Sequence, residues 1–198
     1  MSVPGPGPGP GPRLTLSRPA PGSPLGAAAA QAASRSRLSL RRLFPADPRY
    51  ARAFCALAPG QCIVASDADQ IRGVLLTRVN GQDGFALTAA RFTALYGAVG
   101  LLRLALTRTV ESLTSGPATH ISAFWVDPAY RGGGIGAALL TRLTATTPAE
   151  ITLLARPGRT AFYARHGFAI GGPARLRLIG ALIGMTAMRR APQNRRPQ

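Results

Sequence analysis

The stretch Phe124-Trp-Val-Asp-Pro-Ala-Tyr-Arg-Gly-Gly-Gly-Ile-Gly-Ala-Ala-Leu-Leu140 is the most informative part of this chain of 198 residues. It begins inside an apolar run, His120 to Val126, that has the length and composition of a buried strand. Three consecutive glycines, Gly132 to Gly134, come after a short loop and precede an amphipathic helix. The helix residues expected to face the core are Ile135, Leu139, Leu140 and Leu143. The pattern therefore predicts a strand, a glycine-rich turn and a helix in direct succession.

Such a turn is suited to a phosphate or pyrophosphate group, although glycine-rich turns also occur as plain loops. Glycines adopt positive φ, so successive backbone N–H groups can point at one anion, and the helix start adds unpaired donors. Arg131 adds a charge. The triphosphate-binding loop is excluded because it needs a lysine and the chain has none. Gly132, Gly134 and Ala137 fit a relaxed dinucleotide fingerprint, but the acid expected about 20 positions later is missing, since Glu150 opens a strand.

Two motifs in order connect the chain to a family. The first is Val126-Asp-Pro-x-x-Arg131-Gly-x-Gly134-Ile-Gly136-x-x-Leu-Leu, and the second is Ala161-Phe-Tyr163-Ala-Arg-His-Gly167-Phe168. Together they resemble the signature of the GCN5-related N-acetyltransferases, the GNAT superfamily. Ile71-Arg-Gly73-Val, earlier in the chain, is similar to the central I-x-G strand of that family. The resemblance covers about residues 37–190.

The resemblance implies both a fold and a co-substrate. The fold would be α/β, with a GNAT-like mixed, mostly antiparallel central sheet that is flanked by helices and splayed at the acyl-CoA site. The co-substrate would be acetyl-CoA, with no metal. The strand residues that would lie along the pantetheine arm are Phe124, Trp125 and Val126. The residues of the turn that would hold the pyrophosphate are Arg131, Gly132, Gly133, Gly134, Ile135, Gly136 and Ala137.

The resemblance also implies a mechanism without a covalent enzyme intermediate. A substrate amine would attack the thioester directly, with its carbonyl polarised by a strand N–H near Val126. Tyr163 stands where the family often places the general acid that protonates the leaving thiolate, and a core tyrosine is the alternative reading. The general base is left open among Glu111, Asp83, His120 and a water chain.

These observations predict an enzyme, an acetyl-CoA-dependent N-acetyltransferase. The acceptor amine stays open, because the region that forms the acceptor site in the family, here Phe85 to Leu113, is unusually long. One alternative is acetylation of an aminoacyl group on tRNA. Another is a non-catalytic module that binds acyl-CoA or nucleic acid.

Composition predicts one folded domain between two tails. Residues 1–34 are expected to be a disordered Pro/Gly/Ala-rich tail, because residues 4–12 alternate proline and glycine. Residues 35–190 form the predicted domain, and residues 191–198 a disordered basic tail. Within the domain we expect a hairpin over Cys62–Val79, a helix over Phe92–Leu113, a strand over Glu150–Ala155 and a closing strand over Leu178–Met188.

The charge is unusual, because 24 basic residues face only 7 acidic ones and give a net charge of +17. Such a charge favours anionic partners: phosphates, nucleic acid or an acidic membrane surface. Two cysteines, Cys55 and Cys62, are too few for a disulfide scaffold, which favours a cytoplasmic location. The most apolar windows are too short for a membrane span, which needs about 20 residues. A homodimer is left open.

Overall fold

The computed structural model describes residues 15–19, 23–34, 62–67, 70–78, 97–99, 102, 105 and 118–192. Its elements are β1 (Thr15–Ser17), α1 (Pro24–Ser34), β2 (Cys62–Asp67), β3 (Gln70–Arg78), β4 (Thr119–Val126), the 3-10 helix η2 (Pro128–Tyr130), α4 (Ile135–Thr146), β5 (Ile151–Ala155), α5 (Thr160–Ala164), β6 (Ala169–Ile170), α6 (Ala174–Leu182) and β7 (Thr186–Arg190).

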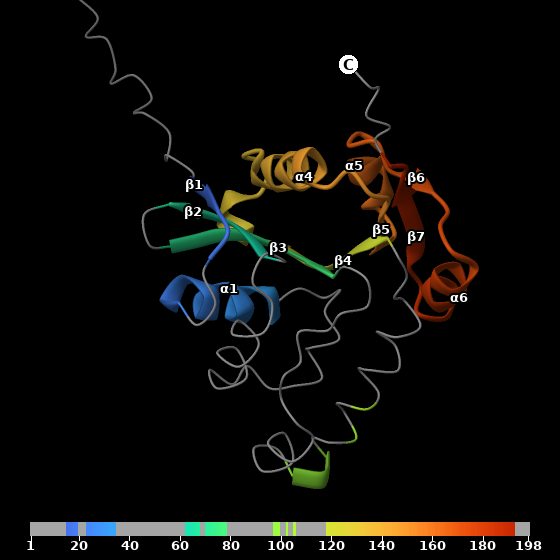
Figure 1. Cartoon of the computed structure of the whole chain (residues 1–198), viewed down its shortest axis with the longest axis horizontal. Coiled ribbons are helices and arrows are strands. Elements are labelled where there is room, and N and C mark those ends of the chain that lie inside the picture. Colours follow the sequence, from blue (N-terminus) through green and yellow to red (C-terminus); the bar gives the residue numbers. More distant parts are fainter. Residues whose placement is uncertain are drawn as a thin grey trace, which may run out of the picture.

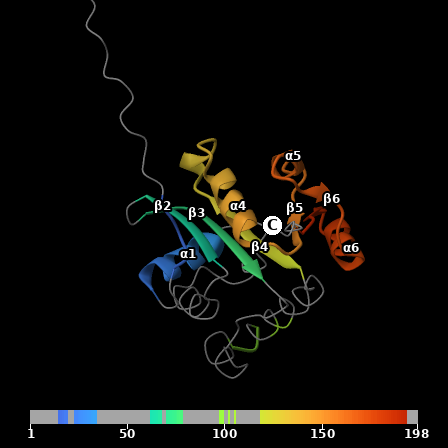
Figure 2. The ribbon, with the colours of Figure 1, turned by 45° about the horizontal axis from the view of Figure 1, so that its top comes forward.

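One seven-stranded sheet runs through the molecule in the order β1-β2-β3-β4-β5-β7-β6. Neighbouring strands are antiparallel except β4 and β5, which are parallel and are connected through α4. Strands β1 to β4 with α1 form one half of the molecule, and β5 to β7 with α5 and α6 form the other (Figures 1 and 2). The predicted fold class, a mixed and mostly antiparallel sheet flanked by helices, is confirmed.

Each face of the sheet has its own apolar core. Helices α4 and α5 lie on one face, whereas α1 and α6 lie on the other (Figure 1). The four residues of α4 that periodicity predicted to face inward are all buried, and they pack with Leu75, Ile121 and Leu153 of the sheet. On the opposite face, Ala29 and Ala32 of α1 pack against Val64, Val74 and Leu76.

Gly73 explains how α4 comes so close to the sheet. A Cβ at this position would lie 2.8 Å from Cγ2 of Ile135 and 3.0 Å from Cδ1 of Leu139. The glycine of the I-x-G strand is therefore required for close approach. It brings the first turn of α4 directly over β3.

The prediction of a disordered tail over residues 1–34 is wrong for two segments. Thr15–Ser17 pairs with Val64–Ser66 of β2, and Pro24–Ser34 forms α1, in which Ala29 and Ala32 are buried. The alanine-rich composition suggested disorder, but alanine is also the best helix former and its small side chain lets a helix pack closely on a sheet. We therefore propose that the folded domain begins near residue 15 rather than at residue 35.

The prediction of a closing strand over Leu178–Met188 is also wrong. Residues 174–182 form α6, and the last strand, β7, covers only Thr186–Arg190. Leu176 and Gly180 are buried one helical turn apart, and a Cβ at Gly180 would lie 3.1 Å from Leu154 of β5. The short apolar run fits a helix and a strand equally well by composition alone.

Several predictions lie outside the described residues: most of the helix over residues 92–113, Cys55, and the candidate bases Asp83 and Glu111. Among the helices that the structure describes, none is both long enough and apolar enough to cross a membrane.

Candidate functional site

The sheet opens between β4 and β5. The two strands pair only at Thr119↔Ile151, His120↔Thr152 and Ile121↔Leu153, although β4 continues to Val126 and β5 to Ala155. On its other side β4 stays paired with β3 as far as Gly73↔Val126. The opening therefore exposes one side of the β4 backbone beyond Ile121, and it widens toward the end of the sheet where the glycine turn lies.

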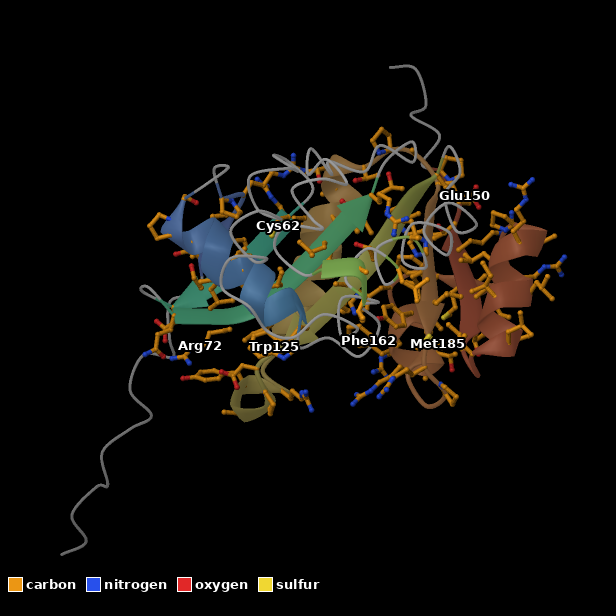
Figure 3. The ribbon with its side chains drawn as sticks, turned by 90° about the horizontal axis from the view of Figure 1, so that it is seen from below. Cys62, Arg72, Trp125, Glu150, Phe162 and Met185 are labelled. Carbon is orange, nitrogen blue, oxygen red and sulfur yellow. The ribbon has the colours of Figure 1, made fainter. Side chains whose placement is uncertain are left out.

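The side chains of this last part of β4 alternate between the two faces. Phe124 and Val126 pack against the core under α4, whereas Trp125 packs against the core on the α1 face. Figure 3 shows Trp125, Arg72 and Phe162 near one end of the sheet, and Glu150 near the opposite end. The three predicted strand residues thus line one side of the opening, and their side chains alternate between the two faces of the sheet.

The glycine turn adopts the conformation for which its residues were singled out. Gly132 and Gly134 have φ of 88° and 80°, in the left-handed region, and a Cβ at either position would meet nothing within 4 Å. These two glycines are therefore required for backbone conformation rather than for space. Gly134 is the N-cap of α4 and offers no side chain to its first turn, so the amides of Ile135, Gly136 and Ala137 stay available to a ligand.

Gly136 is required for a different reason, because two aromatic rings press on the first turn of α4. A Cβ there would lie 3.2 Å from Cζ of Phe162 and 3.4 Å from Cζ of Phe124. Arg131, at the mouth of the turn, is exposed, and its Nε donates to the carbonyl oxygen of Val126 at 3.4 Å. Its guanidinium therefore lies between the end of β4 and the turn.

Asp127, the residue after β4, fixes the position of the turn. Its Oδ1 accepts a hydrogen bond from the amide of Ala129 at 3.1 Å, and its own amide donates to the carbonyl oxygen of Arg72 at 2.8 Å. Arg72 in turn lies 3.6 Å from Oδ2 of Asp127 and 3.9 Å from Oδ2 of Asp67. It also stacks 4.0 Å above the ring of Tyr130. Sequence reasoning missed Arg72, although its place immediately before Gly73 was the available signal.

Tyr163 lies in an aromatic cluster beside the opening. It is 4% exposed, and its ring is 6.2 Å from Phe124, 5.2 Å from Phe162 and 5.9 Å from Phe168, measured between centroids. Burial raises the pKa of the Tyr163 hydroxyl well above its usual value, and the positive charge of Arg159 only partly opposes this shift. Tyr163 is therefore a neutral hydrogen-bond donor throughout the physiological range.

His120 is the candidate base that the structure describes, and it is a very weak one. The ring is 7% exposed, and its Nδ1 lies 3.0 Å from Oγ1 of Thr152. Burial, assisted by the nearby charge of Arg78, lowers the pKa of His120 to about 3. His120 is therefore neutral at physiological pH.

The structure brings the predicted strand residues, the turn and Tyr163 together at one end of the sheet. His120 lies apart from them, at the start of β4 and beside Arg78. No group of three or more histidine, cysteine, aspartate or glutamate side chains that would suit a metal is present in the described part of the chain.

Comparisons with known proteins agree with this geometry. A family model described as the acetyltransferase (GNAT) domain matches residues 58–170, more than half of the chain. A search of curated proteins finds no significant match. The chain belongs to the GNAT acetyltransferase family.

Solved structures share the fold at low sequence identity. A protein from Corynebacterium glutamicum described as histone acetyltransferase HPA2 and related acetyltransferase has a TM-score of 0.54 at 19% identity. The match covers 93% of this chain and 99% of that protein. A protein described only as an acetyltransferase has a TM-score of 0.56 at 14% identity, covering 90% and 100% of the two chains. A GNAT-like decarboxylase, GphF, in complex with isobutyryl-CoA has a TM-score of 0.51 at 17% identity, covering 90% and 98%. The fold alone therefore does not fix the reaction.

Proposed function

We propose that this protein is an acyl-CoA-dependent N-acetyltransferase, which moves the acetyl group of acetyl-CoA to an amine by direct attack. The observation that carries the proposal is the opening between β4 and β5, which leads directly to the glycine turn. An extended ligand with a pyrophosphate at one end fits this combination. Its arm bonds to the exposed backbone of β4, and its phosphates meet the amides of the turn.

The residues that hold the nucleotide end of acetyl-CoA are those of the turn. The amides of Gly132 and of Gly134 to Ala137 bind the pyrophosphate, supported by the positive end of the α4 dipole, whereas the Gly133 amide donates to the carbonyl oxygen of Tyr130 at 3.4 Å. Arg131 adds a charge-assisted contact, for which its exposed guanidinium is well placed. Phe124, Trp125 and Val126 offer their backbone to the pantetheine arm.

In the chemical step, the amine nitrogen attacks the thioester carbon, and the carbon–sulfur bond breaks as the amide forms. A backbone N–H of β4 near Val126 polarises the carbonyl oxygen. Tyr163 acts as the general acid and gives a proton to the leaving sulfur. Its raised pKa keeps the proton on the phenol at physiological pH and makes the phenol a weak acid, so the proton can pass to sulfur only as negative charge develops there. The nitrogen loses its own proton as the amide forms, and that proton passes to the phenolate, so Tyr163 ends the step neutral.

His120 cannot hold the proton of the attacking amine at neutral pH, because its pKa is lowered to about 3. The acceptor therefore enters as the free amine or loses its proton to another group. Amines whose protonated form the site destabilises should therefore be better acceptors than amines that stay protonated there.

A second acceptor class, an aminoacyl group carried by tRNA, is supported by the net charge of +17. Binding of a polyanion weakens steeply as salt is raised, so the logarithm of the tRNA association constant should fall with the logarithm of salt concentration. A flat response would remove this candidate.

Calorimetric titration with acetyl-CoA at physiological salt tests the proposal. Saturable binding to one site is expected, and Gly134→Val should abolish it because a β-branched residue cannot adopt φ of 80° without distorting the turn. Gly184→Val is the matched control, because Gly184 has φ of 67°, would place a Cβ with no neighbour within 4 Å, and lies between α6 and β7, outside the glycine turn. Absence of binding by the unaltered protein would overturn the proposal.

A further inference from the structure

Arg72 is the extra residue of a β-bulge in β3. Ala65 of β2 is opposite Gly73, and the next residue, Ser66, is opposite Ile71, so Arg72 has no partner in β2. Ile71 packs in the core on the α1 face although a Cβ at Gly73 would point at α4, which shows that the alternation of side chains is interrupted between them. A bulge re-aims the side chain of its extra residue. The direction of Arg72 is therefore set by contacts beyond the regular ladder.

The Arg72 side chain reaches from this bulge to the segment between β4 and the glycine turn. Its Nη1 lies 3.6 Å from Oδ2 of Asp127, and its Cζ lies 4.0 Å from the centre of the Tyr130 ring. Its Nη2 lies 3.9 Å from Oδ2 of Asp67, the last residue of β2. The Arg72 side chain is only 15% exposed. It therefore joins the end of the β2–β3 hairpin to the start of the turn.

Tyr130 is connected directly to the glycine turn. Its carbonyl oxygen accepts a hydrogen bond from the Gly133 amide at 3.4 Å, and its own amide donates to the carbonyl oxygen of Asp127 at 2.9 Å. The half-buried ring packs against the core under α4. A shift of this ring would therefore move the backbone of the turn, and the guanidinium stacked on the ring opposes such a shift.

The charge of Arg72 matters because carboxylates gather at this end of the sheet. The acids among the described residues are Asp67, Asp127 and Glu150, and the first two both face Arg72. Without Arg72, the carboxylate of Asp127 would lie uncompensated at the start of the turn, where it would repel a phosphate. Because the guanidinium already faces two carboxylates, direct contact with phosphate is left to the exposed Arg131.

We propose that Arg72 is a positioning residue for the glycine turn. It acts through Tyr130 and Asp127, which it holds in place, and it makes no contact with acyl-CoA itself. Its role is to preserve the conformation in which the amides of the turn meet the pyrophosphate. The inference rests on the proposed acetyltransferase function and assigns a further residue to the co-substrate site.

The experiment measures the dissociation constants of two ligands for Arg72→Met. Acetyl-CoA is followed by calorimetry, and acetyl-pantetheine, which has no pyrophosphate, by NMR titration. The dissociation constant of acetyl-CoA should rise about 5- to 30-fold, the combined contribution of a partly exposed ion pair and a cation–π contact. That of acetyl-pantetheine should change less than about 2-fold, because this ligand has no group that meets the turn and distant contacts couple weakly.

Arg189→Met is the matched control. Arg189 also faces a carboxylate, that of Glu150 at 3.9 Å, and its removal lowers the net charge equally. Arg189 belongs to β7, and Glu150 lies at the end of the sheet opposite to Arg72 (Figure 3). Both dissociation constants should stay within about 2-fold of those of the unaltered protein.

The path through Tyr130 is tested with Tyr130→Leu and with the double variant. Side chains that act through one shared contact give losses that are less than additive, so the double variant should bind acetyl-CoA within about 3-fold of the weaker-binding single variant. Arg72→Lys keeps the charge but loses the planar group that stacks on the ring, so its dissociation constant should lie between those of the unaltered protein and Arg72→Met. If Arg72→Met does not fold, as judged by thermal unfolding, the two ligands are compared with Arg72→Lys.

The outcomes are distinct. No binding of acetyl-CoA by the unaltered protein would remove the proposed function itself. If the unaltered protein binds acetyl-CoA and Arg72→Met binds it equally well, or if the variant loses affinity for both ligands alike, Arg72 does not position the turn. Fully additive losses in the double variant would contradict the path through Tyr130.

Discussion

Gly73 and Gly133 allow the effect of close approach to be measured at single residues. An added Cβ at Gly73 would lie 2.8 Å from Ile135, whereas at Gly133, whose φ is ordinary, the nearest atom is the Tyr130 oxygen at 3.4 Å. We expect Gly73→Ala to lower the free energy of unfolding by about 1–3 kcal/mol through overpacking, and Gly133→Ala to lower it by less than about 1 kcal/mol. Denaturant unfolding of both variants measures this difference, and equal losses would contradict the argument.

Tyr163→Phe tests the general acid. Removal of the hydroxyl should lower kcat by at least about 100-fold and leave the dissociation constant of acetyl-CoA within about 3-fold, because the ring still packs with Phe124, Phe162 and Phe168. Steady-state kinetics and calorimetry supply the two values. Unchanged turnover would show that Tyr163 is a core residue without a role in proton transfer.

His120 makes the fold sensitive to acid. Its pKa is about 3 in the folded protein and about 6.5 in the unfolded chain, so below pH 6.5 only the unfolded chain takes up this proton. The contribution of the neutral His120 ring to stability is present above pH 6.5 and is lost as the pH falls from 6.5 toward 3. Between pH 7 and pH 5 the loss from this group is about 2 kcal/mol.

Unfolding of His120→Gln at the same two pH values measures that loss. The variant should lack this part of the pH dependence, whereas His166→Gln should retain it, since His166 is the other histidine of the chain. An unchanged pH dependence in His120→Gln would show that the buried ring takes up a proton in the folded state.

At the scale of elements, η2 and its cap place the glycine turn at the end of β4. Asp127 both accepts a hydrogen bond from Ala129 and faces Arg72. Asp127→Ala removes both interactions and should cost about 1–2 kcal/mol of stability, whereas Asp127→Asn keeps an acceptor for the amide and should cost less. Acetyl-CoA affinity should fall in the same order, as measured by calorimetry. Equal effects of the two changes would assign the whole contribution to charge.

Local sequence predicted the strand, the glycine turn and α4 well, and the surrounding elements less well. The strand, the turn and α4 depend on neighbouring residues, since Gly132 and Gly134 signal positive φ and the apolar spacing signals a helix. The helix α6 was mistaken for a strand because its burial at Leu176 and Gly180 depends on contact with distant strands.

The sheet places Arg78, His120 and Thr152 side by side on three neighbouring strands, and local sequence could not predict this arrangement. It depends on the register of three strands that are far apart in sequence, including an irregularity between Leu76 and Thr77 that shifts β3 relative to β4. No local pattern specifies such a register, because it is set by packing and by the lengths of the intervening segments.

At the scale of the whole molecule, acetyl-CoA should stabilise the fold, because the proposed site exists only where the strands and the turn are assembled. At a concentration 100 times its dissociation constant, a ligand adds about 2.7 kcal/mol, or about 5–10 °C in Tm for a chain of this size. Acetyl-pantetheine, which lacks the phosphates, should give a smaller shift that depends little on salt. Thermal unfolding with both ligands measures this, and equal shifts would show that the turn does not bind pyrophosphate.

The same three residue pairs that end at Ile121↔Leu153 are the only β-ladder between the two halves of the sheet within the described chain. This makes β4–β5 the mechanically weakest pairing among these strands. A force that pulls β3 away from β7 has to break only three residue pairs between β4 and β5, whereas the β2–β3 and β5–β7 pairings are longer. In kinetic terms it is the parallel pair, whose closure has to wait for the crossover through α4. We therefore expect the β4–β5 pair to form later in folding than the β2–β3 hairpin, which needs no crossover helix.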